Sequence, residues 1–227
     1  MRNKIALTVI IITAILGLTA CNSFLDVIGD RSIASFEQVL DIAKEHTGEN
    51  MTYGGWSLTS PDEEASFVWS WDFTRSQPYD VLLVVNAQPF LDAGLDVSKL
   101  PAGMLEGDKI IVGTELSNYS TADEVDLTPI ASYELIVRKH REVIKYHSAM
   151  DHFGVDLRNG NMFEWAKDMS KNDKDIVFVL DPQPFLAAGV DPERVKGWVF
   201  AKVETMDEKM KMVEVEKFLK PFELDGK

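Results

Sequence analysis

The sequence predicts an α+β fold made of two repeats, each of about 95 residues, with a largely antiparallel sheet. The first observation is a pair of near-identical segments, NAQPFLDAGLD at Asn86–Asp96 and DPQPFLAAGVD at Asp181–Asp191. The second is that a continuous apolar run precedes each of them, at Asp80–Val85 and at Asp175–Leu180. Runs of this length are typical of buried strands.

The third observation is that further matches between the two halves occur in one order. They pair Ile33–Glu37 with Ile130–Glu134, the residues Met51, Gly55 and Leu58 with Met150, Gly154 and Leu157, and Trp69–Trp71 with Phe163–Trp165. Matches in the same order, with differences only in loop length, indicate an internal duplication. The predicted first repeat is 33–116, the connector is 117–128, and the second repeat, with a C-terminal hairpin, is 129–227.

Each repeat is expected to open with an amphipathic helix, because apolar residues recur there at helical spacing. These residues are Phe36, Val39, Leu40 and Ala43 in the first repeat and Tyr133, Ile136, Val137 and Ile144 in the second. A hairpin follows, with the tight-turn pair Asn159-Gly160 in the second repeat and the longer loop Ser60–Glu64 in the first. The buried strand and a short QPFL helix come next. The predicted last strands are Ile110–Leu116 and Trp198–Glu204, and a hairpin around Asp207–Lys209 closes the second repeat.

Most residues of the repeated QPFL segment have a structural reason to be there. Its proline suits the first position of a helix, and its glycine suits the residue just past the helix end. Asn86 and Asp181 can hydrogen-bond the turn before the helix, and Asp96 and Asp191 can cap the turn after it. The remaining residues, the glutamines Gln88 and Gln183, are candidate ligand contacts.

Residues 1–20 have the features of a secretion signal. Arg2 and Lys4 precede an apolar run, Ile5–Leu18, that is shorter than the roughly 20 residues of a spanning helix. The run ends in LTAC at Leu18–Cys21, which resembles the lipobox of bacterial lipoproteins. The resemblance implies that Cys21 is lipidated, that residues 21–32 form the lipidated cysteine and a short tether, and that the protein is extracytoplasmic and lipid-anchored to the bacterial cell membrane. The alternative is an ordinary cleaved signal with an incidental cysteine.

Charge and cysteine content restrict the partners of the mature chain. The whole chain has a formal charge of −14, and removal of the basic residues Arg2 and Lys4 lowers it to −16. Nucleic acid is therefore not expected as a partner, because phosphate binding needs a basic patch. Cys21 is the single cysteine, so the mature domain has no internal disulfide and depends on its core.

No catalytic motif stands out in the sequence. Glycine-rich phosphate loops, a G-x-S-x-G segment and an H-E-x-x-H segment are all absent, and no cofactor is predicted. His140, His147 and Asp151, at i, i+7 and i+11, are expected on one helix face and are weak candidates for a metal site. The alternative is that these histidines are satisfied residues of the core or its boundary.

Aromatic residues of the first repeat suggest a binding surface. Period-two alternation places Phe67, Trp69, Trp71 and Phe73 on one strand face. Trp69 and Trp71 match Phe163 and Trp165 and are expected in the core, whereas Phe67 and Phe73 have no aromatic counterpart. With Tyr53 and Trp56 on the preceding strand, they form the candidate surface. A larger local core is the alternative.

The sequence thus favours a membrane-anchored extracytoplasmic lipoprotein that serves as a non-catalytic binding or interaction module of the cell envelope. Its partners are expected to be the bilayer, through acylated Cys21, and an unknown envelope protein or small ligand. The alternative function is an extracytoplasmic hydrolase or metal-dependent enzyme without a recognisable motif.

Overall fold

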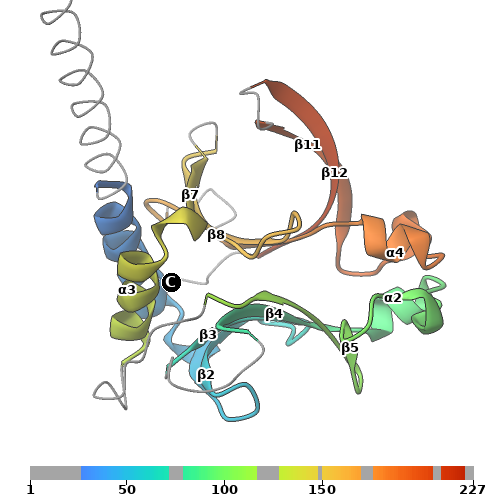
Figure 1. Ribbon diagram of the computed structural model, residues 1–227, viewed down its shortest axis with the longest axis horizontal. Coiled ribbons are helices and arrows are strands. Elements are labelled where there is room, and N and C mark those ends of the chain that lie inside the picture. The colour runs from blue at the N-terminus through green and yellow to red at the C-terminus, as the bar shows by residue number, and fades with distance from the viewer. Residues whose placement is uncertain are drawn as a thin grey trace, which may run out of the picture.

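A computed structural model describes residues 27–71, 79–116, 128–147, 150–169, 176–206 and 211–222. These residues form an α+β fold with two six-stranded antiparallel sheets, which lie one above the other in Figure 1. The predicted α+β class and the antiparallel strand pairing are therefore confirmed. Among the described helices, none has the length and apolar character that crossing a membrane requires.

The first sheet has the strand order β1-β2-β3-β4-β6-β5. A helix over residues 27–42 precedes it. The elements are η1 (Lys44–His46), β1 (Thr47–Asn50), β2 (Gly55–Thr59), β3 (Ala65–Ser70), β4 (Val81–Asn86), α2 (Gln88–Asp92), η2 (Val97–Lys99), β5 (Leu105–Glu106) and β6 (Lys109–Thr114). Residues 27–32, which were expected in the tether, belong to the opening helix.

The second sheet has the strand order β11-β12-β10-β9-β8-β7. Its elements are α3 (Pro129–Lys139), η3 (Arg141–Val143), β7 (Ile144–His147), β8 (His152–Asp156), β9 (Met162–Ala166), β10 (Ile176–Leu180), α4 (Gln183–Ala187), η4 (Pro192–Arg194), β11 (Val199–Met206) and β12 (Met212–Phe222). Read from its other edge, the second sheet has the order β7-β8-β9-β10-β12-β11, which is the order of the first sheet with each strand number raised by six. The arrangement is compatible with two repeats.

The predicted equivalence of the last strands is wrong. β6 pairs with β4 in the first sheet, and the strand that pairs with β10 in the second sheet is β12, not β11. β11 lies outside β12, as the two-residue strand β5 lies outside β6. The C-terminal hairpin is therefore an integral part of the second sheet. Apolar alternation identifies a strand but does not say which strand it pairs with, and β5 is too short to produce a pattern.

The strand registers also correct the predicted match of the aromatic residues. Phe67 pairs with Leu83 across β3 and β4, and Phe163 pairs with Phe178 across β9 and β10. Leu83 and Phe178 each lie three residues before the repeated QPFL segment. Phe67 therefore occupies the place of Phe163, which shifts the predicted match by two residues. Because aromatic residues alternate along both strands, the sequence fits either match equally well. Trp71, which was expected in the core, follows the end of β3 and is only half-buried.

Each opening helix hydrogen-bonds to the sheet of the other repeat. Ser35, in the first helix, donates its hydroxyl to the carbonyl of Lys167 at 2.9 Å and accepts from the Trp165 indole at 3.2 Å. In α3, the hydroxyl of Ser132 donates to the carbonyl of Ser70. The indole of Trp69 donates to the carbonyl of Pro129 at 3.0 Å. The helices thus join the two repeats at one end of the molecule, on the left in Figure 1.

The two QPFL helices join the repeats at the opposite end (Figure 1). The rings of Phe90 in α2 and Phe185 in α4 stack with centroids 4.6 Å apart. The backbone N–H of Asp96 donates to the carbonyl of Ala188 at 2.8 Å, and that of Asp191 donates to the carbonyl of Ala93 at 2.9 Å. The stacked rings and the reciprocal bonds give the repeated segment a structural role, which is to join the two sheets.

The core lies between the sheets. Phe67 and Phe163 stack face to face there, with ring centroids 4.2 Å apart and an interplanar angle of 5°. Phe36 of the opening helix contacts Trp69 at 5.4 Å and Trp165 at 5.1 Å. All five side chains are fully buried, so the two sheets share one main core.

Candidate functional site

A cavity of about 660 Å³, open to solvent, lies where the two repeats meet. Residues of both repeats line it: Tyr79, Gly113, Thr114, Glu115 and Leu116 from the first, and His140, Glu142, Arg158 and Asn159 from the second. Most of these residues carry a polar side chain. The cavity therefore offers hydrogen-bonding and charged groups to a ligand, and it would not exist in either repeat alone.

The lining residues come from the ends of regular elements. Glu115 directly follows β6, and His140 is the C-cap of α3. Arg158 and Asn159 form the tight turn between β8 and β9, where both have left-handed backbone conformations with φ of 65° and 52°. The Asp156 carboxylate accepts the Arg158 N–H at 2.7 Å and orders this turn. The hairpin turn predicted at Asn159-Gly160 is thus confirmed.

Gly113 allows the ring of Tyr79 to lie against β6. A Cβ atom at this position would be 2.9 Å from Tyr79 Cγ and 2.8 Å from the carbonyl oxygen of Val81. Real Cβ atoms do not approach other atoms so closely, so a side chain at Gly113 would displace Tyr79 or the neighbouring strand. The glycine therefore sets the shape of one cavity wall.

Charged groups of both signs surround the cavity. Asp80, which is buried near its rim, accepts the Leu116 N–H at 2.6 Å. Burial raises the pKa of the Asp80 carboxyl; the Leu116 hydrogen bond opposes this rise, whereas the charge of Glu115 adds to it. His140 Nδ1 lies 3.4 Å from Glu142 Oε1. Arg158 can bind an anionic group, and the carboxylates can accept from a donor.

The three weak metal candidates do not share a helix face, so that prediction is wrong. α3 ends at Lys139, His147 lies at the end of β7, and Asp151 lies in the following turn. The Asp151 carboxylate accepts from the Tyr146 hydroxyl and from Lys167, at 3.2 Å in the latter case. In the part of the chain that the structure describes, no three His, Cys, Asp or Glu side chains are placed to hold a metal ion.

His147 belongs instead to a buried carboxylate cluster that the sequence did not reveal. Glu164 of β9 is only 5% exposed, and its two carboxylate oxygens lie 3.2 Å from His147 Nδ1 and 3.8 Å from His152 Nδ1. A Cβ atom at Gly154 would be 3.2 Å from Glu164 Cγ, so the glycine leaves room for this side chain. Cross-strand pairing brings His147 opposite His152, a proximity that depends on the register.

The His147–Glu164 pair is charge-coupled. Burial would raise the pKa of Glu164, but the hydrogen bond from His147 and the nearby charges of His147 and His152 outweigh burial, so the pKa lies below its usual value. The hydrogen bond to Glu164 raises the pKa of His147, although burial opposes this effect. Both shifts favour the ionised pair in the folded state.

We expect the pair to stabilise the protein most between about pH 4.5 and pH 6.5. Glu164 contributes fully above its ordinary pKa of 4.5, and its contribution is lost as the pH falls. His147 contributes fully below its ordinary pKa of 6.5, and its contribution is lost as the pH rises through the raised value. In urea unfolding, His147→Gln should therefore cost more stability at pH 5.5 than at pH 9. An equal cost at both pH values, or the same pH dependence in a Glu164→Gln background, would contradict the coupling.

The predicted aromatic surface is not assembled as expected. Phe67 is fully buried against Phe163, so it is a core residue and cannot contact a ligand. Phe73 lies outside the described residues. Tyr53 packs, half-buried, on the outer face of the first sheet, where its hydroxyl is 3.4 Å from Glu106. Trp56 packs against the main core and contacts Trp71, with ring centroids 6.1 Å apart.

The two glutamines are exposed at the starts of α2 and α4. The amide of Gln88 donates to Asp92 at 2.7 Å in the same helix. Neither Gln88 nor Gln183 lines the cavity. Their role in binding a ligand stays a prediction.

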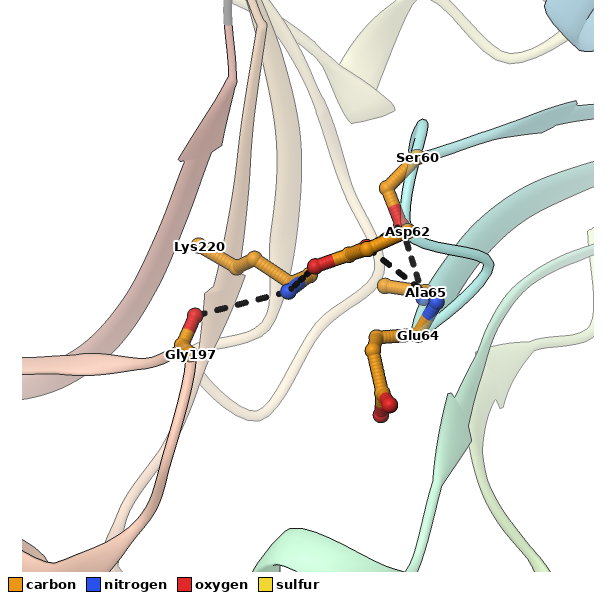
Figure 2. Close-up of polar contacts among 6 residues, drawn as sticks. All are labelled: Ser60, Asp62, Glu64, Ala65, Gly197 and Lys220. Carbon is orange, nitrogen blue, oxygen red and sulfur yellow. Dashed lines mark hydrogen bonds and ion pairs between the residues drawn. The ribbon is translucent and has the colours of Figure 1, made fainter.

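A buried lysine provides a further polar contact between the repeats (Figure 2). Lys220 of β12 is 4% exposed, and its Nζ lies 2.6 Å from Asp62 in the β2–β3 loop and 3.4 Å from the carbonyl of Gly197. The ammonium also lies 5.9 Å from the ring centre of Trp198. Figure 2 shows the Glu64 side chain pointing away from this contact. Lys220 shares a strand face with the core residue Phe218, and this alternation is the signal that could have revealed its burial.

These residues define a two-sheet α+β protein with a polar cavity between its halves. The chain matches no family model, no curated protein and no solved structure. The geometry of the site is therefore the main basis for a functional proposal.

Proposed function

We propose that the protein is a lipid-anchored, extracytoplasmic binding module of the cell envelope, and that it binds a small polar ligand in the cavity between its repeats. The observation that carries this proposal is the convergence of Arg158, Glu115 and Glu142 from separate elements on one solvent-open cavity. A concave site with a few convergent polar groups is the usual form of a small-molecule site. A ligand with an anionic group for Arg158 and a hydrogen-bond donor for a carboxylate fits this lining.

A common ancestry of the two halves supports a site at their junction. We infer that the halves arose by duplication of one unit of helix, hairpin, buried strand, short helix and final hairpin. The equal strand orders and the reciprocal hydrogen bonds of Asp96 and Asp191 support this inference. A shared core makes the pair one folding unit, and junctions of this kind are common places for ligand sites.

The proposed anchor would hold the domain close to the bilayer. Cys21 lies outside the described residues, and the described helix begins at residue 27. Six residue steps of chain span at most about 20 Å. Acyl chains on Cys21 would each contribute about 0.8 kcal/mol per buried methylene, so several chains would give stable attachment.

Replacing Cys21 with alanine should release the protein from the membrane fraction or leave its signal uncleaved, because the acylated side chain is lost. Fractionation of cells followed by mass measurement of the protein tests this prediction. A Ser23→Ala variant, two residues away, is the matched control and should remain attached. Detergent-requiring membrane association of the Cys21→Ala variant at its mature mass would contradict lipid anchoring.

Native mass spectrometry of the protein purified from its own envelope tests the binding proposal. We expect a retained small molecule in the native chain and its loss in Arg158→Ala, because a hydrogen bond between charged groups contributes about 1.5–3 kcal/mol, or roughly 10- to 150-fold in affinity. Arg138→Ala is the control, since Arg138 pairs with Glu134 on the surface of α3, outside the cavity. The absence of any bound molecule from the native chain, or equal retention by both variants, would oppose the proposal.

A further inference from the structure

The hairpin of β11 and β12 extends beyond the rest of the second sheet. Only Phe218–Phe222 of β12 pair with β10, whereas β11 pairs with β12 from Val199 to Met206. Residues 201–206 and 212–217 therefore form a two-stranded arm. Figure 1 shows this arm projecting away from the two sheets.

The two faces of the arm differ: one carries the valines together with Lys217, which is opposite Ala201, and the other carries most of the charged residues. Val203 pairs with Val215 on the first face, and both valines are half-exposed. On the other face, Lys202 pairs with Glu216, and Glu204 pairs with Glu214. Like charges directly opposite each other on neighbouring strands are destabilising. A cation on the free side of β11 would relieve the repulsion between Glu204 and Glu214.

The outer edge of β11 is available for pairing. Within the described residues, β11 pairs only with β12. β11 has eight residues, whereas the other edge strands, β1, β5 and β7, have four, two and four. A long edge strand presents a row of backbone donors and acceptors, to which a further strand can be added.

We propose that the edge of β11 binds β11 of a second copy of this chain, in antiparallel register about Val203. A two-fold axis through this point places Lys202 opposite Glu204 of the second copy, and Glu204 opposite Lys202 of the second copy. Two opposite-charge pairs then form, and each Glu204 gains a lysine directly opposite it, where its own hairpin places Glu214. The valines of the two arms form one continuous apolar strip on the other face.

The charges select this register over its neighbours. Centring the pair on residue 202 would place Lys202 opposite Lys202, and centring it on residue 204 would place Glu204 opposite Glu204. A shift by a single residue would place apolar side chains opposite charged ones. The Val203 register also uses the same surface on both copies, which gives a closed dimer and not an open chain of molecules. The two second sheets would join into one sheet of twelve strands.

Native mass spectrometry of the full-length chain, released from detergent in the gas phase, tests the dimer. We expect a dimer for the native chain and at least about a tenfold weaker association for Lys202→Glu, which places a glutamate opposite Glu204 in both pairs. The charge exchange Lys202→Glu/Glu204→Lys should restore the dimer. Lys44→Glu makes the same charge change at an exposed site in the first repeat and should have no effect. A monomeric native chain, or a dimer that Lys202→Glu does not weaken, would overturn the proposal.

Disulfide trapping tests the register independently. Val203→Cys should form a disulfide-linked dimer under mild oxidation, because side chains opposite each other on antiparallel strands have Cβ atoms about 4.5–5.5 Å apart. Val215→Cys is the matched control: Val215 lies on the same face, but the two copies of residue 215 would be three strand spacings, or about 14 Å, apart. The native chain controls for bridges through Cys21. Equal trapping of both variants, or no trapping of Val203→Cys, would contradict the register.

Discussion

Replacing Phe67 with alanine is expected to destabilise the protein by about 3–5 kcal/mol, the usual cost of removing a buried phenylalanine ring. Phe67 is fully buried, and it stacks on Phe163 of the other sheet with ring centroids 4.2 Å apart. The second sheet cannot move in to fill the space, because the helices hold the repeats together at both ends. Urea unfolding followed by tryptophan fluorescence measures the loss.

A double-mutant cycle separates the ring contact from simple burial. Phe67→Ala and Phe163→Ala should be coupled by about 0.5–1.5 kcal/mol, the value typical of aromatic pairs. Met51→Ala, at a side chain that is 74% exposed, is the control and should change stability by less than about 0.5 kcal/mol. A loss below about 1 kcal/mol for Phe67→Ala would mean that Phe67 is not a core residue, and the predicted aromatic surface would again be a candidate.

The Lys220–Asp62 contact should respond unequally to removal of its two partners. Asp62→Ala leaves the buried ammonium with the Gly197 carbonyl and the Trp198 ring, and breaking a buried pair in this way costs about 3–5 kcal/mol. Because the Asp62 side chain is 53% exposed, water can replace part of the lost contact, and we expect a loss of about 2 kcal/mol. Lys220→Met removes the buried charge and retains most of the volume. The exposed Asp62 carboxylate can then be hydrated, so the expected cost is below about 1 kcal/mol.

The relative stability losses of these variants show whether an unpaired buried charge is the cause. The double variant Asp62→Ala/Lys220→Met should be close to Lys220→Met alone, because no charge remains buried. Asp92→Ala, at an exposed aspartate in α2, is the control for removing a surface carboxylate. If urea unfolding showed a larger loss of stability for Lys220→Met than for Asp62→Ala, this prediction would be wrong. The contacts of Lys220 would then stabilise the fold by more than burial of its charge destabilises it. The pKa of Asp62 lies below its usual value, as expected for a charged pair. Burial would raise this pKa, but the hydrogen bonds from Lys220 and Ser60 lower it.

The candidate site could be anticipated only in fragments. The tight turn that carries Arg158 has a local signature, the Asn159-Gly160 pair, and this turn was correctly predicted. The cavity itself joins segments that are separated by up to 80 residues along the chain, from Tyr79 to Asn159. No spacing in the sequence places the end of β6 beside a turn of the second sheet. The sequence singles out His147, but its partner, Glu164, is two strands away, and their contact depends on the strand register.

The sequence by itself determined the features that arise from interactions within a few residues. These are the buried strands, the hairpin turns, and the short helices, in which the glycines and the capping aspartates have their expected positions. The proline is the second residue of each short helix, one position later than expected. Only the tertiary structure decided that β12 and not β11 pairs with β10, that each opening helix bonds to the other repeat, and that Phe67 is buried. The physical reason is that strand pairing and burial depend on partners from distant parts of the chain. The alternation of apolar and polar residues along a strand is the same whichever strand lies beside it.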